Sequence, residues 1–194
     1  MKKIVLASNN KHKIKEFKEI LNTVELLTLN DIEFFSEIEE NGSTFLENAL
    51  IKASVISKYL KSIGLDYDVL ADDSGLCCIG LDLAPGIYSA RYSGSHGNDK
   101  ENRDKLISDL KGKNNTAYFN CTIVLYHIDG TYEYKKGKTY GKIIDEELGD
   151  TSFGYDSIFL SDDLGKTFGQ ASSAEKNKFS HRSRALEQIK KFIQ

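Results

Sequence analysis

The chain has 194 residues, of which 40% are hydrophobic and 28% charged, and it contains a single proline. This composition is typical of an ordinary globular protein and argues against disorder or a flexible linker, and the length suits one compact domain spanning residues 1–194. With 26 Lys and Arg against 29 Asp and Glu, the net charge is -3, which argues against a nucleic-acid binder with a broad basic face. Any polyanion that binds is therefore expected to be small and to meet local groups.

The cysteines and the amino terminus give two further exclusions. Cys77, Cys78 and Cys121 form no Cys-x-x-Cys motif and no even-numbered set, so neither a zinc site nor a disulfide framework is predicted. The apolar stretch near Met1 is too short for a secretory signal, and no segment approaches membrane-spanning length. We therefore expect a cytoplasmic protein that does not enter a membrane.

Hydrophobic periodicity predicts an alternation of strand and helix in the first half of the chain. A buried strand is expected at residues 4–7 and an amphipathic helix at 11–21. A longer helix is expected at 44–63, where Thr44 and Glu47 can form a capping box. The pattern is that of an α/β protein.

The second half of the chain indicates a mixed sheet. A helix is expected at 99–110 and a long strand at 117–128. An Asp-Gly dipeptide then favours a tight hairpin leading into a strand at 131–135. A loop-rich stretch should follow, and a closing helix is expected at 180–193.

Two adjacent carboxylates, Asp72 and Asp73, follow the apolar run 69–71 and precede Ser74 and Gly75. Charges beside a hydrophobic core need a cation or good hydrogen bonds, because each loses its hydration. Oxygen ligands of this kind suit Mg²⁺, which is commonly shared between one or two carboxylates and substrate phosphates. This interpretation predicts a metal and phosphate site at a strand end; the alternative is a surface turn, for which the same residue types are suited.

Three cations fall on helix faces that should be buried. Lys13 lies between the apolar positions of its helix, Lys52 lies beside the apolar stripe of the second helix, and Arg182 is in line with apolar positions of the last one. Each could bury its stem and extend its charged end to water. Lys13 and Arg182 also lie in first helical turns, where free backbone N–H groups already favour an anion.

Further candidate residues flank these cations. Ser8 and Asn10, between the first strand and helix, supply a hydroxyl and an amide for a phosphate, and Glu40 is either an extra metal carboxylate or part of a solvated acidic loop. Phe153 is either a stacking platform for a base or core packing. His181 is the histidine expected to join the cationic cluster.

Six ordered blocks in the chain resemble the inosine triphosphate pyrophosphatase family. They are Ser8-x-Asn10-x-x-Lys13, Glu40-x-Gly42-x-Thr44-Phe45-x-Glu47-Asn48-Ala49-x-x-Lys52-Ala53, Ala71-Asp72-Asp73-Ser74-Gly75-Leu76, the stretch Ala84-Pro85-Gly86-Ile87-Tyr88-Ser89-Ala90-Arg91-Tyr92-Ser93-Gly94, Phe153-Gly154-Tyr155-Asp156 and Ser180-His181-Arg182. The resemblance runs from the first expected strand to the last helix. It implies an α/β fold with an elongated mixed β-sheet flanked by helices, in two lobes with a central cleft, and a homodimer.

The resemblance also implies an activity and a set of site residues. The activity is Mg²⁺-dependent hydrolysis of dITP, ITP and XTP to monophosphate and pyrophosphate, which removes deaminated purines from the nucleotide pool. Carried over by position, Asp73 and Lys13 are catalytic, and Asp73, Glu40 and Asp72 hold the metal. The substrate-binding residues implied are Ser8, Asn9, Asn10, Lys11, His12, Lys13, Lys52, Ser74, Phe153, Gly154, Tyr155, Asp156, Lys176, His181 and Arg182.

Two positions depart from the family pattern. Many members have Thr-Gly-Asn where this chain has Ser8-Asn9-Asn10, and a proline where it has Ser157. The second departure is expected to loosen the loop that binds the base. Two alternative functions stay open from sequence: a pyrophosphatase acting on other modified nucleotides, and a nucleotide sensor without turnover.

Overall fold

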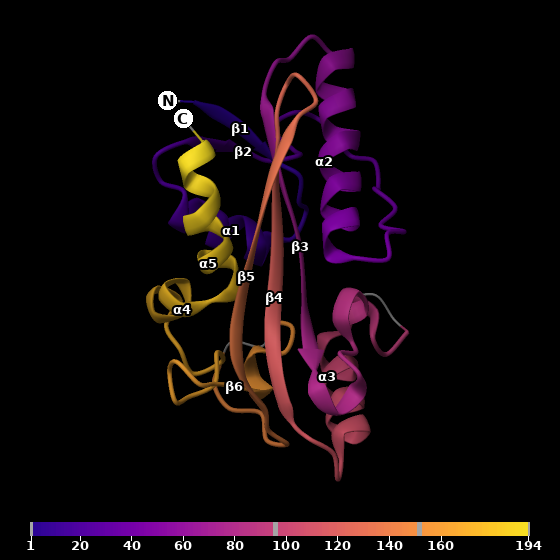
Figure 1. The fold of residues 1–194 in the computed structure, drawn as a ribbon, viewed down its shortest axis with the longest axis vertical. Helices are drawn as coiled ribbons and strands as arrows, with labels where there is room; N and C mark the ends of the chain where they lie inside the picture. Colours follow the sequence, from indigo (N-terminus) through magenta and orange to yellow (C-terminus); the bar gives the residue numbers. More distant parts are fainter. Residues whose placement is uncertain (1, 95–96, 151–152, 194) are drawn as a thin grey trace. The chain divides into compact units, whose positions relative to one another are not determined.

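The computed structural model describes residues 2–94, 97–150 and 153–193, which form a mixed α/β fold (Figure 1). The strands are β1 (Lys3–Leu6), β2 (Glu25–Leu27), β3 (Asp68–Cys78), β4 (Thr116–Tyr126), β5 (Tyr132–Ile143) and β6 (Phe159–Ser161). The helices are α1 (Lys11–Ile20), α2 (Phe45–Ser62), α3 (Asp99–Leu110), α4 (Ser173–Phe179) and α5 (His181–Ile189), with short 3₁₀ turns at Ile79–Leu81, Gly86–Arg91, Asp156–Ile158 and Lys190–Phe192. The predicted α/β class with a mixed sheet flanked by helices is confirmed.

The six strands form one sheet in the order β2-β1-β3-β4-β5-β6. β1 is parallel to both neighbours, so that Val5 lies opposite Leu27 of β2 and Val69 of β3. β6 is antiparallel to β5, with Leu160 opposite Lys142. Parallel pairs need crossover connections, and here α1 and α2 supply them.

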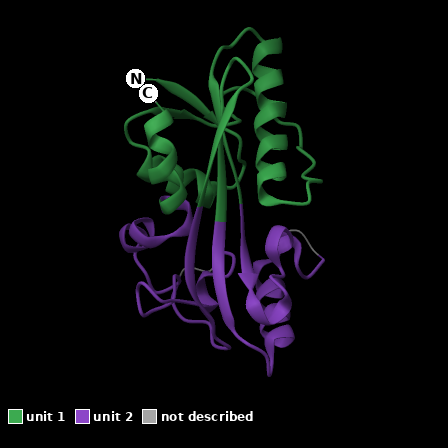
Figure 2. Ribbon diagram, in the orientation of Figure 1, with its two compact units in different colours: residues 1–73, 121–136, 184–194 green, residues 74–120, 137–183 purple. Residues whose placement is uncertain are grey.

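The chain divides into two compact units (Figure 2). Unit 1 consists of residues 1–73, 121–136 and 184–194, and unit 2 of residues 74–120 and 137–183. β3, β4 and β5 contribute residues to both units. Each unit has its own hydrophobic core.

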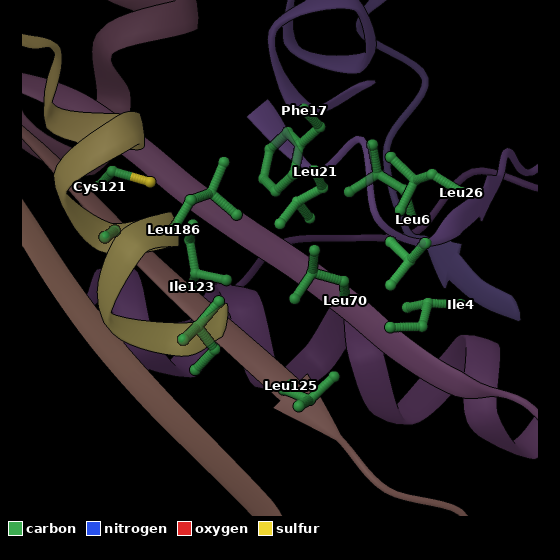
Figure 3. Close-up of a cluster of buried hydrophobic side chains, with 13 residues drawn as sticks. Ile4, Leu6, Phe17, Leu21, Leu26, Leu70, Cys121, Ile123, Leu125 and Leu186 are labelled. Carbon is green, nitrogen blue, oxygen red and sulfur yellow. The ribbon is translucent and has the colours of Figure 1, made fainter. Parts of the chain in front are cut away.

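The core of unit 1 lies on both faces of its strands, because successive strand residues point to opposite sides. Ile4, Leu6 and Leu70 pack against Phe17 of α1 and Leu186 of α5 (Figure 3). On the other face the same strands pack against α2, through Val5, Val69, Ala71, Ala49, Ala53, Ile56 and Leu60. Helices therefore cover both faces of the strands in unit 1.

The core of unit 2 joins β3, β4, β5 and β6 to α3 and to the loop before β6. Its buried apolar residues are Leu76, Cys78, Leu106, Leu110, Ala117, Phe119, Ile143, Tyr155, Ile158, Phe159 and Phe168. Aromatic rings fill its centre, where the centroids of Phe119 and Phe159 are 4.7 Å apart. Tyr155 belongs to this core, which fixes one residue of the predicted base-binding loop.

Several predicted elements differ from the structure. β3 continues to Cys78, so Asp72 and Asp73 lie in the middle of a strand and not at its end. β5 runs to Ile143 instead of ending at 135, because its alternate positions from Gly137 onward are buried. In the predicted capping box, Thr44 accepts from the backbone N–H of Glu47, but the Glu47 carboxylate accepts from Ser43.

Other elements agree with the sequence expectations. The helices expected at 44–63 and 99–110 are found as α2 and α3, and α2 is capped by Thr44. The Asp-Gly turn is present, with the His127 N–H donating to the Thr131 carbonyl at 2.8 Å and Gly130 at a φ of +93°. Among the described residues, none of the helices combines the length and the hydropathy needed to cross a membrane.

Candidate active site

The side chains of Asp72 and Asp73 point to opposite faces of β3. Asp72 shares a face with Leu70 and is directed toward α1 and Cys121, whose Sγ lies 3.9 Å from Asp72 Oδ2. Asp73 shares a face with Val69 and Ala71 and is directed toward α2. Both carboxylates are buried, with exposed fractions of 1% and 7%. The strand thus places one carboxylate in each of two different environments.

Asp72 forms an ion pair with Lys13. The distance between Lys13 Nζ and Asp72 Oδ2 is 2.9 Å, and the Lys13 side chain is 15% exposed. Lys13 belongs to the first turn of α1, so the lysine predicted to lie on the inward face of this helix does so. The ion pair holds the ammonium group beside the buried strand instead of leaving it to extend into solvent.

The loop from Ser8 to Asn10 is organised by hydrogen bonds at the start of α1. The Asn10 side chain caps the helix by accepting from the N–H groups of His12 and Lys13, at 3.0 and 3.1 Å. The Asn10 N–H in turn lies 3.3 Å from the Ser8 hydroxyl, to which it donates. Asn9, Lys11 and His12 are exposed, while Ser8, Asn10 and Lys13 are half-buried. The predicted phosphate loop is therefore a capped helix start with accessible polar side chains.

Asp73 is held by a residue that the sequence analysis did not select. Asn48 of α2 donates from Nδ2 to Asp73 Oδ2 at 3.0 Å. One turn further along the same helix, Lys52 Nζ lies 2.7 Å from Glu40 Oε2. Helical spacing alone puts Asn48 and Lys52 on one face, so the signal was present in the sequence.

The electrostatic surroundings of Asp73 are mixed. Burial is the main influence and raises the pKa of its carboxyl group, while the nearby charges of Lys52 and Lys13 and the Asn48 hydrogen bond oppose that rise. The negative charge of Glu40 adds to the rise of the Asp73 pKa. Burial and the neighbouring Glu40 charge therefore both disfavour the ionised form of Asp73, which a bound cation would stabilise.

These residues fit a hard divalent cation held through few protein ligands. Asp73 and Glu40 offer oxygen atoms only, which suits Mg²⁺ with its remaining positions filled by water or phosphate. In the part of the chain that the structure describes, no three His, Cys, Asp or Glu side chains converge on a possible metal position. Asp72 faces Lys13, so its role as a third metal ligand stays a prediction, as do the metal-ligand roles of Asp73 and Glu40.

In unit 2, Asp156 and Lys176 form a buried ion pair beside aromatic rings. Their Oδ2 and Nζ atoms are 2.6 Å apart, and the residues are 4% and 9% exposed. The Lys176 ammonium also lies 5.6 Å from the ring centroids of Phe153 and Phe168. Three of the predicted base-binding residues, Phe153, Asp156 and Lys176, are thus brought together.

Gly154 and Tyr155 complete the same loop through contacts with residues that sequence reasoning missed. Asp99 and Arg103 of α3 bind the backbone of Gly154, and the Tyr155 hydroxyl donates to the Ser89 carbonyl at 2.8 Å. Burial is the main cause of the raised pKa of Tyr155, which keeps this phenol protonated as a donor. The sequence placed Asp99 and Arg103 on one helix face but carried no signal for their partner.

The last two predicted residues are buried at the start of α5. The His181 ring stacks on Phe119 at a centroid distance of 4.8 Å and an interplanar angle of 14°. Arg182 is 2% exposed, which agrees with its predicted inward position. The Ser180 hydroxyl accepts from the Ser183 N–H at 3.2 Å and so caps this helix.

Ser74, the first residue of unit 2, is half-buried on β3.

Comparison with known proteins places this arrangement in a family. The sequence profile of the Ham1 family matches residues 4–192. The chain belongs to the Ham1 family. This confirms the resemblance inferred from the six sequence blocks.

Ham1 relatives match along nearly the whole chain. A protein of Clostridium perfringens named dITP/XTP pyrophosphatase is 48% identical, over 98% of this chain and 96% of its own length. One of the same name from Bacillus subtilis is 40% identical over 100% and 98%. The solved structure of the Staphylococcus aureus Ham1 protein superposes with a TM-score of 0.86 at 38% identity, covering 99% of this chain and 98% of that one.

Proposed function

We propose that this chain is a nucleoside triphosphate pyrophosphatase that hydrolyses dITP, XTP and ITP to the monophosphate and pyrophosphate. The observation that carries the proposal is the charged cluster of unit 1, in which Asp73 and Glu40 lie among Lys13, Lys52 and Asn48. A binding-only protein gains little from carboxylates facing a polyphosphate, whereas a hydrolase uses them to hold a metal and a water. The relatives named dITP/XTP pyrophosphatase support this assignment.

Asp73 is the proposed general base. It orients a water molecule and accepts its proton as the oxygen attacks the α-phosphorus, and the bond from that phosphorus to the bridging oxygen breaks to release pyrophosphate. Asp73 and Glu40 would hold Mg²⁺, which when bound neutralises phosphate charge and polarises the phosphoryl oxygens. Reactions of this type depend chiefly on positioning and charge stabilisation.

The cations and the helix start of unit 1 are the proposed triphosphate ligands. Lys13 is held in place by Asp72, and Lys52 by Glu40, so both ammonium groups have defined positions before substrate arrives. The loop before α1 carries the exposed or half-buried polar residues Ser8, Asn9 and Asn10. These residues and Ser74 would add hydrogen bonds to the phosphates. Positioned charges contribute more than mobile ones because little reorganisation is needed.

The loop of unit 2 is the proposed purine site. Phe153 would stack on the base, and Asp156, Lys176, His181 and Arg182 would bind its edge or the sugar. Donors that meet the six-position carbonyl of hypoxanthine or xanthine would be left unpaired by the amino group of adenine, which is an effective way to reject an analogue. Arg182 is the proposed donor of this kind.

One assay tests the function directly. The purified chain is incubated with dITP, XTP, ITP, dATP, dGTP and modified pyrimidine triphosphates with Mg²⁺ or with a chelator, and pyrophosphate and phosphate are measured separately. We expect pyrophosphate from the deaminated purines only, a loss of turnover with chelator, and a loss in Asp73→Asn. Release of phosphate instead, or turnover of pyrimidines alone, would reject the assignment; binding without turnover would indicate a sensor.

The homodimer is also a proposal. Size-exclusion chromatography with light scattering, run at several protein concentrations, tests it. The expected molecular mass is twice the 21.8 kDa of one chain.

A further inference from the structure

We infer that Asp99, Arg103 and Glu147 are positioning residues that fix the nucleobase loop, residues 153–157. The inference deepens the proposed function and rests on it for the role of this loop. All of these residues belong to unit 2. None of the three was selected from the sequence, and none is proposed to touch substrate.

The first observation concerns the backbone on both sides of Gly154. The Gly154 N–H donates to Asp99 Oδ2 at 2.7 Å, and the Gly154 carbonyl accepts from Arg103 Nη1 at 2.9 Å. Asp99 and Arg103 are one turn apart on α3, so a single rigid helix face holds both peptide groups that flank one Cα atom.

Gly154 is the residue where this restraint matters most. Its φ is +58°, a conformation that glycine adopts readily and other residues rarely do, and a Cβ atom built there would meet no other atom within 4 Å. Glycine is thus favoured here by its backbone conformation and not by lack of space. Because glycine is the most flexible residue type, contacts at both of its peptide groups restrain the position where the loop could most easily rotate.

The second observation is that the far end of the loop reaches the same network. Arg103 is 5% exposed, and its Nη2 atom lies 3.0 Å from Glu147 Oε2. The hydroxyl of Ser157 donates to that same oxygen at 3.2 Å. The backbone supports this connection, because the Leu148 N–H donates to the Ser157 carbonyl at 2.9 Å. Glu147 therefore links the beginning and the end of the loop.

The groups proposed to read the base adjoin these two anchored positions. Phe153 precedes Gly154, and Asp156 precedes Ser157 and pairs with Lys176 at 2.6 Å. A rotation at Gly154 would displace the Phe153 ring, while loss of the Glu147 contact would remove the side-chain restraint on Ser157, next to Asp156. The proposed catalytic residues belong to unit 1 and make none of these contacts. Loosening the loop should therefore weaken base binding and leave the chemical step little changed.

A merely structural role for these contacts makes a different prediction. If they only stabilise unit 2, their loss should lower the melting temperature and, through the smaller amount of folded protein, the apparent kcat, while KM stays unchanged. If they position the loop, KM for dITP should rise while kcat per folded enzyme stays nearly constant. The comparison of kcat with KM separates the two roles.

The experiment compares Asp99→Ala with Asp99→Asn and Arg103→Gln with Arg103→Lys, and adds Glu147→Gln. The asparagine retains an acceptor for the Gly154 N–H, so it should preserve the contact that alanine removes. Asp104→Ala is the matched control, because Asp104 lies on the same helix, is exposed and pairs with Lys100 one turn away on that helix. For each variant, KM and kcat are measured for dITP, together with thermal melting and hydrogen exchange of the peptides that cover residues 153–157.

We expect Asp99→Ala and Arg103→Gln to raise KM for dITP about tenfold or more with kcat within about threefold of wild type, and to speed exchange in the loop. Asp99→Asn should restore KM to within about threefold, and Asp104→Ala should behave as wild type. The inference would be overturned if Asp99→Ala and Arg103→Gln left KM for dITP unchanged, whether or not kcat fell. It would also be overturned if hydrogen exchange in the loop were unchanged in these variants.

The exchange measurement also separates this inference from the proposed function. If wild-type protein released no pyrophosphate from dITP, the proposed function would fail. Faster hydrogen exchange at residues 153–157 in the variants would then still support the positioning of this loop by Asp99 and Arg103, whereas unchanged exchange would reject it.

Discussion

Asn48 joins Asp73 to the loop that carries Glu40. Its Nδ2 donates to Asp73 Oδ2 at 3.0 Å, and its Oδ1 accepts from the Gly42 N–H at 2.9 Å. Asn48 is 1% exposed, so both bonds are made away from bulk water. One amide therefore fixes the relation between the proposed base and the loop of the second proposed metal carboxylate.

Replacing Asn48 with alanine should lower both activity and stability. Gly42 would lose its acceptor and Asp73 its donor, and a buried polar group left unsatisfied costs about 1–3 kcal/mol. Outer residues that orient metal ligands typically contribute about 10- to 100-fold to activity or metal affinity. We expect a loss of that size in kcat/KM for dITP, measured beside urea unfolding. Ser62→Ala, at the exposed end of the same helix, is the control; wild-type kcat/KM in Asn48→Ala would contradict the role.

Asp73→Asn should stabilise the metal-free protein at neutral pH while abolishing activity. Burial raises the Asp73 pKa in the folded state, so the folded protein retains a proton that the unfolded chain has lost. Stability is then lost as pH rises from the ordinary aspartate pKa through the higher folded one. The amide removes this penalty and still accepts from Asn48.

The test of this effect is urea unfolding at pH 4 and pH 7 in the presence of chelator. The free energy of unfolding of the variant should exceed that of wild type at pH 7, with a smaller difference at pH 4. The idea fails if the variant is the less stable protein at neutral pH.

The ion pair of Lys13 with Asp72 should show strong coupling. Removing one partner of a buried pair leaves an isolated charge and costs roughly 3–5 kcal/mol. We expect Lys13→Met to be destabilised to that extent, and the double variant Lys13→Met with Asp72→Asn to be less destabilised than the sum of the two single ones. Chemical unfolding of all four proteins gives the coupling energy. Strict additivity would mean that the pair makes no net contribution.

Phe153 provides a direct test of base stacking. Stacking of a base on an aromatic ring is worth about 1–3 kcal/mol, so Phe153→Leu should raise KM for dITP about 10- to 100-fold with little effect on kcat. Phe153→Tyr keeps the ring and should stay close to wild type. Steady-state kinetics on the three proteins decides, and an unchanged KM in the leucine variant would return Phe153 to a packing role.

Much of the secondary structure and several inward-facing cations could be predicted from the sequence. The α3 helix was expected at its observed bounds, and the burial of Lys52 and Arg182 follows from helical period alone. These features are local, since they depend on residues three or four positions apart. The α4 helix was missed although Ser172 and Glu175 form a full capping box, because the segment is short and carries a weak apolar pattern.

The sequence by itself determined which residue types carry the chemistry and, through six ordered blocks, the family to which they belong. Only the tertiary structure decided their partners. β3 continues past Asp73, and the resulting alternation assigns Asp72 to Lys13 and Asp73 to Asn48. Likewise, the contacts of Arg103 with Gly154 join residues 51 positions apart. Such pairings depend on how distant segments pack, and local periodicity contains no information about which distant segment a buried polar group will meet.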